Sequence, residues 1–349
     1  METIMADMTG GIDEKAMEKA GEILKRGGLV AFPTETVYGL GANALDEAAA
    51  ARIYAAKGRP SDNPLIVHIC EFSALEKIVK EIPPKAKKLA DAFWPGPLTM
   101  IFQKTEQVPY GTTGGLDTVA VRMPAHPLAL AMIKAGGGYI AAPSANTSGR
   151  PSPTKASHVA DDLNGKIDMI IDGGDVGIGL ESTIVDLTEE EPVILRPGYI
   201  NQQMLEGLLG QVSVDQALLK DDPNLHPKAP GMKYRHYAPK AGLTIVEGSA
   251  EAVRRKINEL AEAETRAGGR AGIIATDESL SAYPTGIVKS VGTRTDEITI
   301  SAHLYGILRE FDELDVSRIY SEAFETPQLG QAIMNRLIKA AGHQIIRAE

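Results

Sequence analysis

A chain of 349 residues is long enough to form two domains of ordinary size. Its single cysteine, Cys70, excludes an internal disulfide framework and predicts a reducing compartment, the cytoplasm, and no apolar run approaches the roughly 20 residues of a membrane span. The formal net charge of −10 lacks the basic excess typical of nucleic-acid-binding proteins, although a local basic patch stays compatible with it.

Helix and strand signals alternate through the first 205 residues. Residues 14–28 form an amphipathic pattern that ends at Gly27 and Gly28, and residues 45–57 are rich in alanine, so both segments are predicted helices. Residues 126–137 and 201–210 also have helical patterns. Short apolar runs predict strands at 29–35, 63–70, 117–124, 138–144, 168–174, 182–187 and 192–197. This mixture predicts an α/β or α+β domain with a large sheet that ends near residue 205.

The periodicity is lost over residues 211–240, where prolines are frequent and no apolar face is evident. This stretch is either a passive spacer or a functional loop. Beyond it, strand signals at 243–248, 271–276, 286–292 and 317–324 alternate with helix signals at 251–269, 303–314 and 329–342. That alternation predicts a small, doubly wound parallel-sheet domain. The expected division is therefore 1–205, a linker at 206–241, and 242–349.

Several familiar motifs are absent or weak. "GLGANA", residues 39–44, fits G-x-G-x-x-A, but no strand runs directly into its glycines as a dinucleotide site requires. The sequence has no G-x-x-x-x-G-K-[ST] loop and no G-x-S-x-G elbow, so a phosphate-binding P-loop and a serine hydrolase have little support. Cys70 lies in an apolar run, where core packing is the simpler interpretation.

Polar clusters occur at the ends of the predicted strands. The segments are "PTET" (33–36), "KGRPSDN" (57–63), "LDTVAVRMP" (116–124), "APSANTSGRPSPT" (142–154), "ESTIVDL" (181–187) and "LRPG" (195–198). Each cluster alone is most simply a turn or a cap. Jointly they supply arginines, a lysine, hydroxyls and amides close to strand ends, where open α/β sheets place ligands. Thr118 and Arg122 are evenly spaced on one strand and therefore share a face.

This chemistry suits phosphates and a carboxylate. An arginine offers a planar fork to two oxygens and a lysine offers a point charge. Neither a Ser–His–Asp set nor a cysteine nucleophile accompanies these groups, so catalysis is expected to work by positioning and charge neutralisation. His68 interrupts an apolar strand and, taken alone, is as readily a buried core histidine as a site residue.

These motifs, taken together, resemble those of a known protein family. "FPTETVYGLG", "KGRPSDNPLIVH", "WPGPLT", "GLDTVAVRMPAHP", "APSANTSGRPSPT", "ESTIVD" and "LRPG" are together similar to the YrdC-like domain of L-threonylcarbamoyladenylate synthases. "APGMKYRHYAPKAGL" and the βα domain that follows resemble the long, two-domain form of that family. The resemblance implies a twisted mixed-sheet catalytic domain, followed by a Rossmann-like domain. Nothing in the sequence of that second domain looks catalytic, and the sequence does not show what it binds.

The family is a group of nucleotidyltransferases that convert L-threonine, bicarbonate or CO₂, and ATP to threonylcarbamoyl-AMP and pyrophosphate. The product serves the threonylcarbamoyladenosine modification of tRNA next to the anticodon. The resemblance implies a threonine side formed by Thr36, His68, Arg122, Ala142 and Ser182. It implies an ATP side formed by Lys57, Arg59, Asn63, Thr118, Ser144, Ser152 and Arg196, with Lys57 and Arg59 as the catalytic cations, and a lid residue, Tyr234.

Some expectations about partners accompany this resemblance. Mg²⁺ is expected on the substrate phosphates rather than in a carboxylate cage, because it commonly binds through such phosphates. A downstream transferase would take the product, and direct contact with tRNA would be weak at most. The alternative is an RNA-binding module that uses the same polar surface without chemistry. The acidic net charge speaks against that alternative, and tight, salt-sensitive tRNA binding without nucleotide turnover would favour it.

Overall fold

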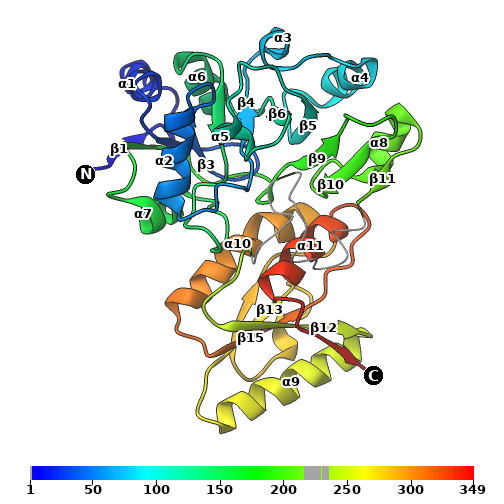
Figure 1. Cartoon of the computed structure of the whole chain (residues 1–349). Coiled ribbons are helices and arrows are strands. Elements are labelled where there is room, and N and C mark those ends of the chain that lie inside the picture. The colour runs from blue at the N-terminus through cyan, green and yellow to red at the C-terminus, as the bar shows by residue number, and fades with distance from the viewer. Residues whose placement is uncertain (1, 216–228, 230–235) are drawn as a thin grey trace. The chain divides into compact units, whose positions relative to one another are not determined.

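A computed structural model describes residues 2–215, 229 and 236–349 of the chain (Figure 1). The chain divides into two compact units. The first comprises residues 1–148, 152–177 and 181–234, and the second comprises 149–151, 178–180 and 235–349. Tyr234, the expected lid residue, lies outside the described residues. No helix among the described residues is long and apolar enough to cross a membrane.

The first unit is built on a mixed 11-stranded sheet with the strand order β1-β8-β2-β3-β7-β4-β6-β5-β9-β10-β11. Parallel and antiparallel pairs alternate irregularly along it, as the sequence resemblance implied. The strands are β1 (Ile4–Asp7), β2 (Val30–Phe32), β3 (Gly39–Asn43), β4 (Ile66–His68), β5 (Leu98–Gln103), β6 (Thr118–Arg122), β7 (Ile140–Ala142), β8 (Met169–Asp172), β9 (Thr183–Asp186), β10 (Val193–Arg196) and β11 (Ser213–Val214).

The helices of this unit begin and end where their capping residues predict. Asp13 and Asp46 accept hydrogen bonds from backbone N–H groups in the first turns of α1 and α2. Gly58 ends α2 in the left-handed conformation, with φ at 62°, directly after Lys57. The helices are α1 (Glu14–Lys25), α2 (Glu47–Lys57), α3 (Leu75–Ile78), α4 (Pro84–Phe93), α5 (Tyr110–Thr113), α6 (Pro127–Ala135), α7 (Ala156–Leu163) and α8 (Gln202–Leu209), with the 3₁₀ turn η1 (Phe72–Ala74).

The central strands β4, β5, β6 and β9 have two different faces. One set of alternating side chains, including Val67, Met100, Val121 and Val185, lies in the large hydrophobic core. The other set forms a smaller buried apolar cluster: Ile66, Ile101, Ala120, Ile184 and Leu195, together with Ala229. The strands are short and regularly paired, so side chains two residues apart share a face.

The "GLGANA" motif forms strand β3 rather than a phosphate-binding loop. A Cβ built on Gly41 would lie 2.9 Å from Ile140 Cγ2 and 3.2 Å from Phe32 Cε1. The glycine is therefore explained by close packing between β3 and its neighbours, and the dinucleotide interpretation has no structural support.

The second unit contains a five-stranded sheet with the order β14-β13-β15-β12-β16, in which every pair is parallel. It is the parallel-sheet domain that the βα alternation predicted. Helix α9 contacts β12, β13, β15 and β16, whereas α11 packs on β12 and α10. The elements are β12 (Gly242–Gly248), α9 (Ala250–Arg266), β13 (Ala271–Ala275), η3 (Leu280–Ala282), β14 (Ile287–Ser290), α10 (Glu297–Glu313), β15 (Arg318–Glu322), α11 (Gly330–Ala340) and β16 (Ile345–Ala348).

The expected boundary at residue 205 falls inside a helix. Helix α8 runs from Gln202 to Leu209, and strand β11 continues the chain by pairing with β10. Both elements belong to the first unit. The three-part division of the chain is kept as a proposal, with its linker beginning after β11.

Candidate active site

The polar side chains predicted for the threonine side gather at one end of the central strands. His68 ends β4 and Arg122 ends β6, and the two residues are in register across this parallel pair. Thr99, near the start of antiparallel β5, is the register partner of Arg122 on its other side. All three are nearly inaccessible to solvent and lie on the face whose floor is the small apolar cluster.

Arg122 is held by the loop that follows β2. Its Nη1 donates a hydrogen bond of 2.9 Å to Thr36 Oγ1, and its Nε donates to the Gly96 carbonyl at 3.3 Å. Its Nη2 lies 2.6 Å from Glu35 Oε1 as an ion pair that lacks good hydrogen-bond alignment. The Thr36 hydroxyl also lies 2.9 Å from Thr34 Oγ1. A buried guanidinium with a fixed fork can bind a carboxylate in two-point fashion.

His68 is neutral at physiological pH. Burial lowers its pKa from 6.5 to about 3, and the neighbouring Arg122 charge lowers it further. Its Nδ1 lies 3.1 Å from the Ile66 carbonyl, and the edge of its ring meets Phe32. A neutral imidazole that resists protonation can shape a pocket or form hydrogen bonds, but it is a poor proton acceptor near pH 7.

A second chain of contacts extends from this cluster toward β10. Thr99 Oγ1 and Ser182 Oγ are 2.7 Å apart. Arg196 donates from Nε to the Ser182 carbonyl at 3.0 Å and from Nη2 to the Ser182 hydroxyl at 3.1 Å. Arg196, predicted on the ATP side, therefore contacts Ser182, predicted on the threonine side. The two predicted groups meet at this position.

Lys57 joins the end of helix α2 to the loop after β7. Its ammonium donates to the backbone carbonyls of Ser144, at 2.6 Å, and Asn146. Only 2% of Lys57 is exposed. The Ser144 hydroxyl donates to Asn146 Oδ1 at 2.6 Å, so the side chains in this loop are also fixed. The helix therefore delivers a positive charge to a rigid hydroxyl- and amide-bearing loop.

The turn that follows Gly58 is stiffened from within. Arg59 donates to the carbonyls of Asn63, at 3.3 Å, and Pro64, at 3.0 Å. Asn63 is 2% exposed, yet its Oδ1 has no hydrogen-bond partner among the described residues. A buried amide oxygen without a partner is costly unless a ligand or water satisfies it. Asn63 is therefore the residue of this turn that most directly indicates a ligand.

The other predicted residues lie as follows. Ser152 is buried and donates to Glu181 Oε1 at 2.6 Å. Ala142, the last residue of β7, is the register partner of Ile66 at the start of β4. Thr118 begins β6, opposite Gln103 at the end of β5, and is partly buried. It shares the face of Arg122, as its spacing predicted.

The site occupies two ends of the central strands instead of one sheet edge. His68, Thr99 and Arg122, called the Arg122 cluster below, lie at the carboxyl ends of β4 and β6. Ala142, Ser144 and Thr118 lie at the opposite ends of these strands. The reason is the antiparallel orientation of β7, which carries its own carboxyl end to the far side. A ligand that touches both groups would lie along the face of the sheet, over Ile66 and Ala120.

Several contacting residues were not among the predicted site residues. Glu35 pairs with Arg122, Thr34 contacts Thr36, and Thr99 contacts Ser182. The Asn146 carbonyl accepts from Lys57, and Glu181 accepts from Ser152. All five lie within the quoted motifs. Thr99 was detectable as a hydroxyl within the apolar run that forms β5, and Glu181 as a carboxylate directly before Ser182.

The described residues contain no group of three or more His, Cys, Asp or Glu side chains that could hold a metal ion. The donors near Lys57 are carbonyls, hydroxyls and an amide, which do not form a carboxylate cage. A magnesium ion would therefore have to depend on oxygens supplied by a substrate. The site as a whole presents fixed cations, which suit anionic ligands.

Comparisons with known proteins identify the class of enzyme. Residues 22–198 match the family model described as "Telomere recombination", of the Sua5, YciO and YrdC type, and residues 200–342 match "Threonylcarbamoyl-AMP synthase, C-terminal domain". These matches, together with the α/β fold, define the class: a two-domain nucleotidyltransferase that uses ATP.

The particular family follows from close relatives. The chain is 50% identical to the threonylcarbamoyl-AMP synthase of Pyrococcus abyssi, over 99% of both chains, and 50% identical to that of Bacillus subtilis, over 96% of this chain and 95% of the other. The crystal structure of P. abyssi Sua5 complexed with L-threonine superposes with a TM-score of 0.94 at 49% identity, covering 99% of this chain and 100% of that one. The chain belongs to the two-domain, Sua5-type threonylcarbamoyl-AMP synthases, which serve the threonylcarbamoyladenosine modification of tRNA.

Proposed function

We propose that the substrates are L-threonine, bicarbonate or CO₂, and ATP, and that they lie across the sheet face between the Arg122 cluster and the Lys57 loop. The observation that carries the proposal is the arrangement of buried polar groups at both ends of one apolar floor. The similar P. abyssi structure holds L-threonine, which supports a threonine site in this fold. Cytoplasmic activity fits these substrates.

We assign the Arg122 cluster to threonine. The Arg122 guanidinium would bind the threonine carboxylate, because a planar fork matches two carboxylate oxygens. Thr36, Ser182 and neutral His68 would shape the surroundings of the side chain, and Ala142 would leave space for it. Because His68 does not ionise near neutral pH, it would add no charge that repels the substrate ammonium.

We assign Lys57 and the remaining polar residues of the site to ATP. Lys57 and Arg59 would neutralise charge on the phosphates as the α-phosphate is attacked. Asn63 would bind the nucleotide through its buried Oδ1, which has no hydrogen-bond donor among the described residues. The binding surface would be completed by Thr118, Ser144, Ser152 and Arg196. Mg²⁺, carried on the phosphates, would supply further charge neutralisation.

The chemistry would proceed in two bond-forming steps. The neutral threonine amine forms a C–N bond to carbon dioxide, which is supplied directly or by loss of water from protonated bicarbonate, and the nitrogen loses a proton, which gives a carbamate. A carbamate oxygen then forms a bond to the α-phosphorus, the bond to the bridging oxygen breaks, and pyrophosphate leaves. Both the carbamate and the mixed anhydride are labile to water, so a covered site would protect them.

The segment after β11 would provide that cover. Ala229 is fully buried in the apolar cluster with Ile66, Ala120 and Ile184, on the face proposed to hold the substrates. This contact supports a lid in preference to a passive spacer. Tyr234, five residues further, would be the aromatic member of the lid. A downstream transferase would then receive the protected product, with tRNA contact weak at most.

Pyrophosphate release tests this function directly. Wild-type protein with ATP, bicarbonate and Mg²⁺ should release pyrophosphate only when L-threonine is present. Glycine in place of threonine controls for general amine reactivity and should give little release. Threonine-independent release from folded protein, or no release at all, would contradict the proposal.

A further inference from the structure

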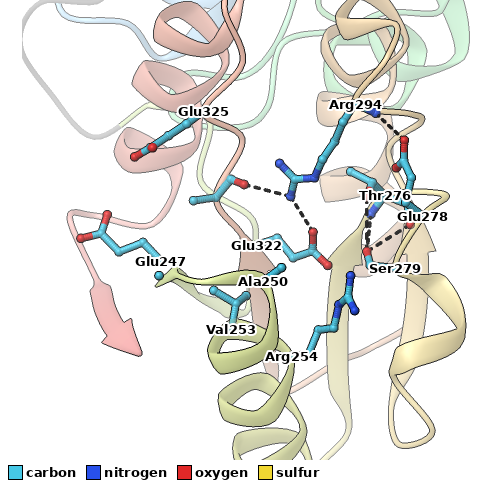
Figure 2. A pocket seen from close by; sticks show the side chains of 12 residues that line it. Glu247, Ala250, Val253, Arg254, Thr276, Glu278, Ser279, Arg294, Glu322 and Glu325 are labelled. Atoms are coloured by element: carbon cyan, nitrogen blue, oxygen red, sulfur yellow. Dashed lines mark hydrogen bonds and ion pairs between the residues drawn. The ribbon is translucent and has the colours of Figure 1, made fainter. Parts of the chain in front are cut away.

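The second unit contains a cavity that the proposed catalysis does not use. It has a volume of about 380 Å³ and lies at the carboxyl ends of β12, β13 and β15 in the parallel sheet (Figure 2). Its wall is formed by Glu247, Gly248, Ala250, Val253, Arg254, Thr276, Glu278, Ser279, Arg294, Glu322, Ala323 and Glu325. Ligands of open parallel sheets commonly bind outside the carboxyl ends of the strands.

Most of the carboxylates in this wall are already satisfied. Glu322 accepts from Tyr283 Oη at 2.7 Å and pairs with Arg294 Nη2 at 2.7 Å, and Arg294 also donates to the Ala323 carbonyl at 3.1 Å. Glu247 pairs with Arg347 at 2.7 Å. These contacts fix the groups in place and neutralise the charges of Glu322 and Glu247.

Glu278 is also held in its ionised form. It accepts from the Thr293 hydroxyl and from the Arg294 backbone N–H, and the Thr293 bond is the main cause of a pKa lowered to about 2. The backbone on which Arg294 lies is thereby anchored, so its guanidinium is oriented before any ligand binds.

Arg254 is different, because it is exposed and its guanidinium has no hydrogen bond or ion pair within the described part of the chain. It extends from α9 toward Ser279, in the turn after β13, and Glu322, at the end of β15, as Figure 2 shows. The first N–H groups of any α-helix have no acceptor within the helix, and at the start of α9 the cap residue Ser249 accepts from the Ala252 N–H. An unpaired arginine beside a helix N-terminus favours a phosphate group.

A second cavity, whose wall is more apolar, lies beside the first. It has a volume of about 480 Å³ and shares Glu247 and Glu325 with the first cavity. Its remaining wall is formed by Thr326, Pro327, Gly330, Gln331, Met334 and Ile338. The combined space provides a cation, carboxylates that can accept from hydroxyls, and an apolar surface that can cover a flat ring.

We propose that these two cavities form a nucleotide-binding site of the second unit, separate from the catalytic site, with a preference for a nucleoside 5′-monophosphate. The phosphate would bind Arg254 and the start of α9. The ribose hydroxyls would donate to Glu322 or Glu325, and the base would lie against Pro327 and Met334. This site does not depend on the proposed assignment of substrates in the first unit.

Hydrogen exchange of the full-length protein, titrated with AMP, tests the proposal region by region. AMP should protect peptides that cover residues 248–254 and 276–294, and peptides that cover 57–68 report the catalytic unit independently. Arg254→Ala should raise the midpoint for the first set by about tenfold or more, since a charge-assisted hydrogen bond is lost. Arg266→Ala, an exposed arginine at the other end of α9, should leave that midpoint nearly unchanged.

Three results would overturn the site. They are no protection of 248–254 at millimolar AMP, equal midpoints in the wild type and Arg254→Ala, and protection that is lost in Arg59→Ala but retained in Arg254→Ala. Inorganic phosphate with the same midpoint as AMP would overturn the nucleoside assignment. Weaker binding of 2′-deoxy-AMP would support ribose recognition by the carboxylates, and equal binding would contradict it.

Discussion

Arg59 illustrates how a turn can hold a cation ready for a substrate. It follows the left-handed Gly58, and its guanidinium is braced against the carbonyls of Asn63 and Pro64. Pro60 and Pro64 stiffen the same turn. A charge positioned in this way needs little rearrangement when negative charge develops on a phosphate, which is the basis of electrostatic preorganisation.

We expect Arg59→Ala to lower kcat for threonylcarbamoyl-AMP formation by about 30- to 1000-fold, which corresponds to about 2–4 kcal/mol of lost transition-state stabilisation. Arg52→Ala is the matched control, because Arg52 lies on α2, the helix before this turn, and among the described residues its side chain donates only to the Gly27 carbonyl. Steady-state pyrophosphate release measures both variants. A wild-type rate in Arg59→Ala would remove Arg59 from the catalytic cations.

His68 makes the free energy of unfolding depend on pH. Its pKa is about 3 when folded, against 6.5 in the unfolded chain, so between these values only the unfolded chain binds the proton. The free energy of unfolding should therefore fall as pH drops below about 6.5, by up to about 1.4 kcal/mol per pH unit from this residue. Above pH 6.5 the contribution is fully present.

Urea unfolding of the wild type and His68→Gln from pH 7 to pH 4 measures this effect. The variant should have a shallower pH dependence, because the titrating imidazole is gone. His303→Gln, in the second unit, serves as the control for losing a histidine elsewhere. Parallel pH profiles for the wild type and His68→Gln would show that His68 protonates equally in the folded and unfolded chains.

At the scale of single elements, close packing around β3 explains why a glycine occupies position 41. A methyl group on Gly41 would contact Ile140, Phe32 and the Val30 carbonyl at 2.9–3.3 Å. Gly41→Ala should lower the free energy of unfolding by about 1–3 kcal/mol, the usual cost of overpacking a tight core. Gly177→Ala, where a Cβ meets nothing within 4 Å, should change it much less. Equal unfolding midpoints in the two variants would refute the packing explanation.

Strong periodicity made several elements predictable. Helices α1, α6 and α9 and strands β4, β6 and β13 lie where apolar patterns and capping residues placed them. Strand β3 was not predicted, because its glycines resemble a nucleotide loop. Strand β5 also escaped prediction, although its apolar run "LTMIF" is clear in retrospect. In both cases the strand is stabilised by its neighbours in the sheet, and local sequence carries little of that information.

The candidate site was only partly predictable for a similar reason. The motifs located Lys57, Arg122 and Ser182, because charged and hydroxyl side chains stand out beside buried strands. They did not reveal that Arg122 pairs with Glu35 or that Arg196 contacts Ser182. The first contact depends on the loop after β2 reaching the end of β6, and the second on the antiparallel pairing of β9 with β10; the motifs themselves do not encode either arrangement.

On the scale of the whole molecule, the segment after β11 links the two units and supplies Ala229 to the apolar floor. Truncation after residue 215 should retain the 11-stranded sheet but reduce product formed per ATP consumed by about tenfold or more, since labile intermediates would meet water. Tyr234→Ala in the full chain separates loss of the lid from loss of the second unit. Unchanged product yield in both variants would leave the segment as a spacer.

The most direct measurement of the central claim is the fate of labelled bicarbonate. Wild-type protein is incubated with ATP, Mg²⁺, L-threonine and ¹³C-bicarbonate, and the adenylate product is analysed by mass spectrometry. The account predicts one ¹³C atom in threonylcarbamoyl-AMP, formed in equal amount to pyrophosphate and absent without threonine. Pyrophosphate release accompanied only by unlabelled threonyl-AMP or AMP would contradict it.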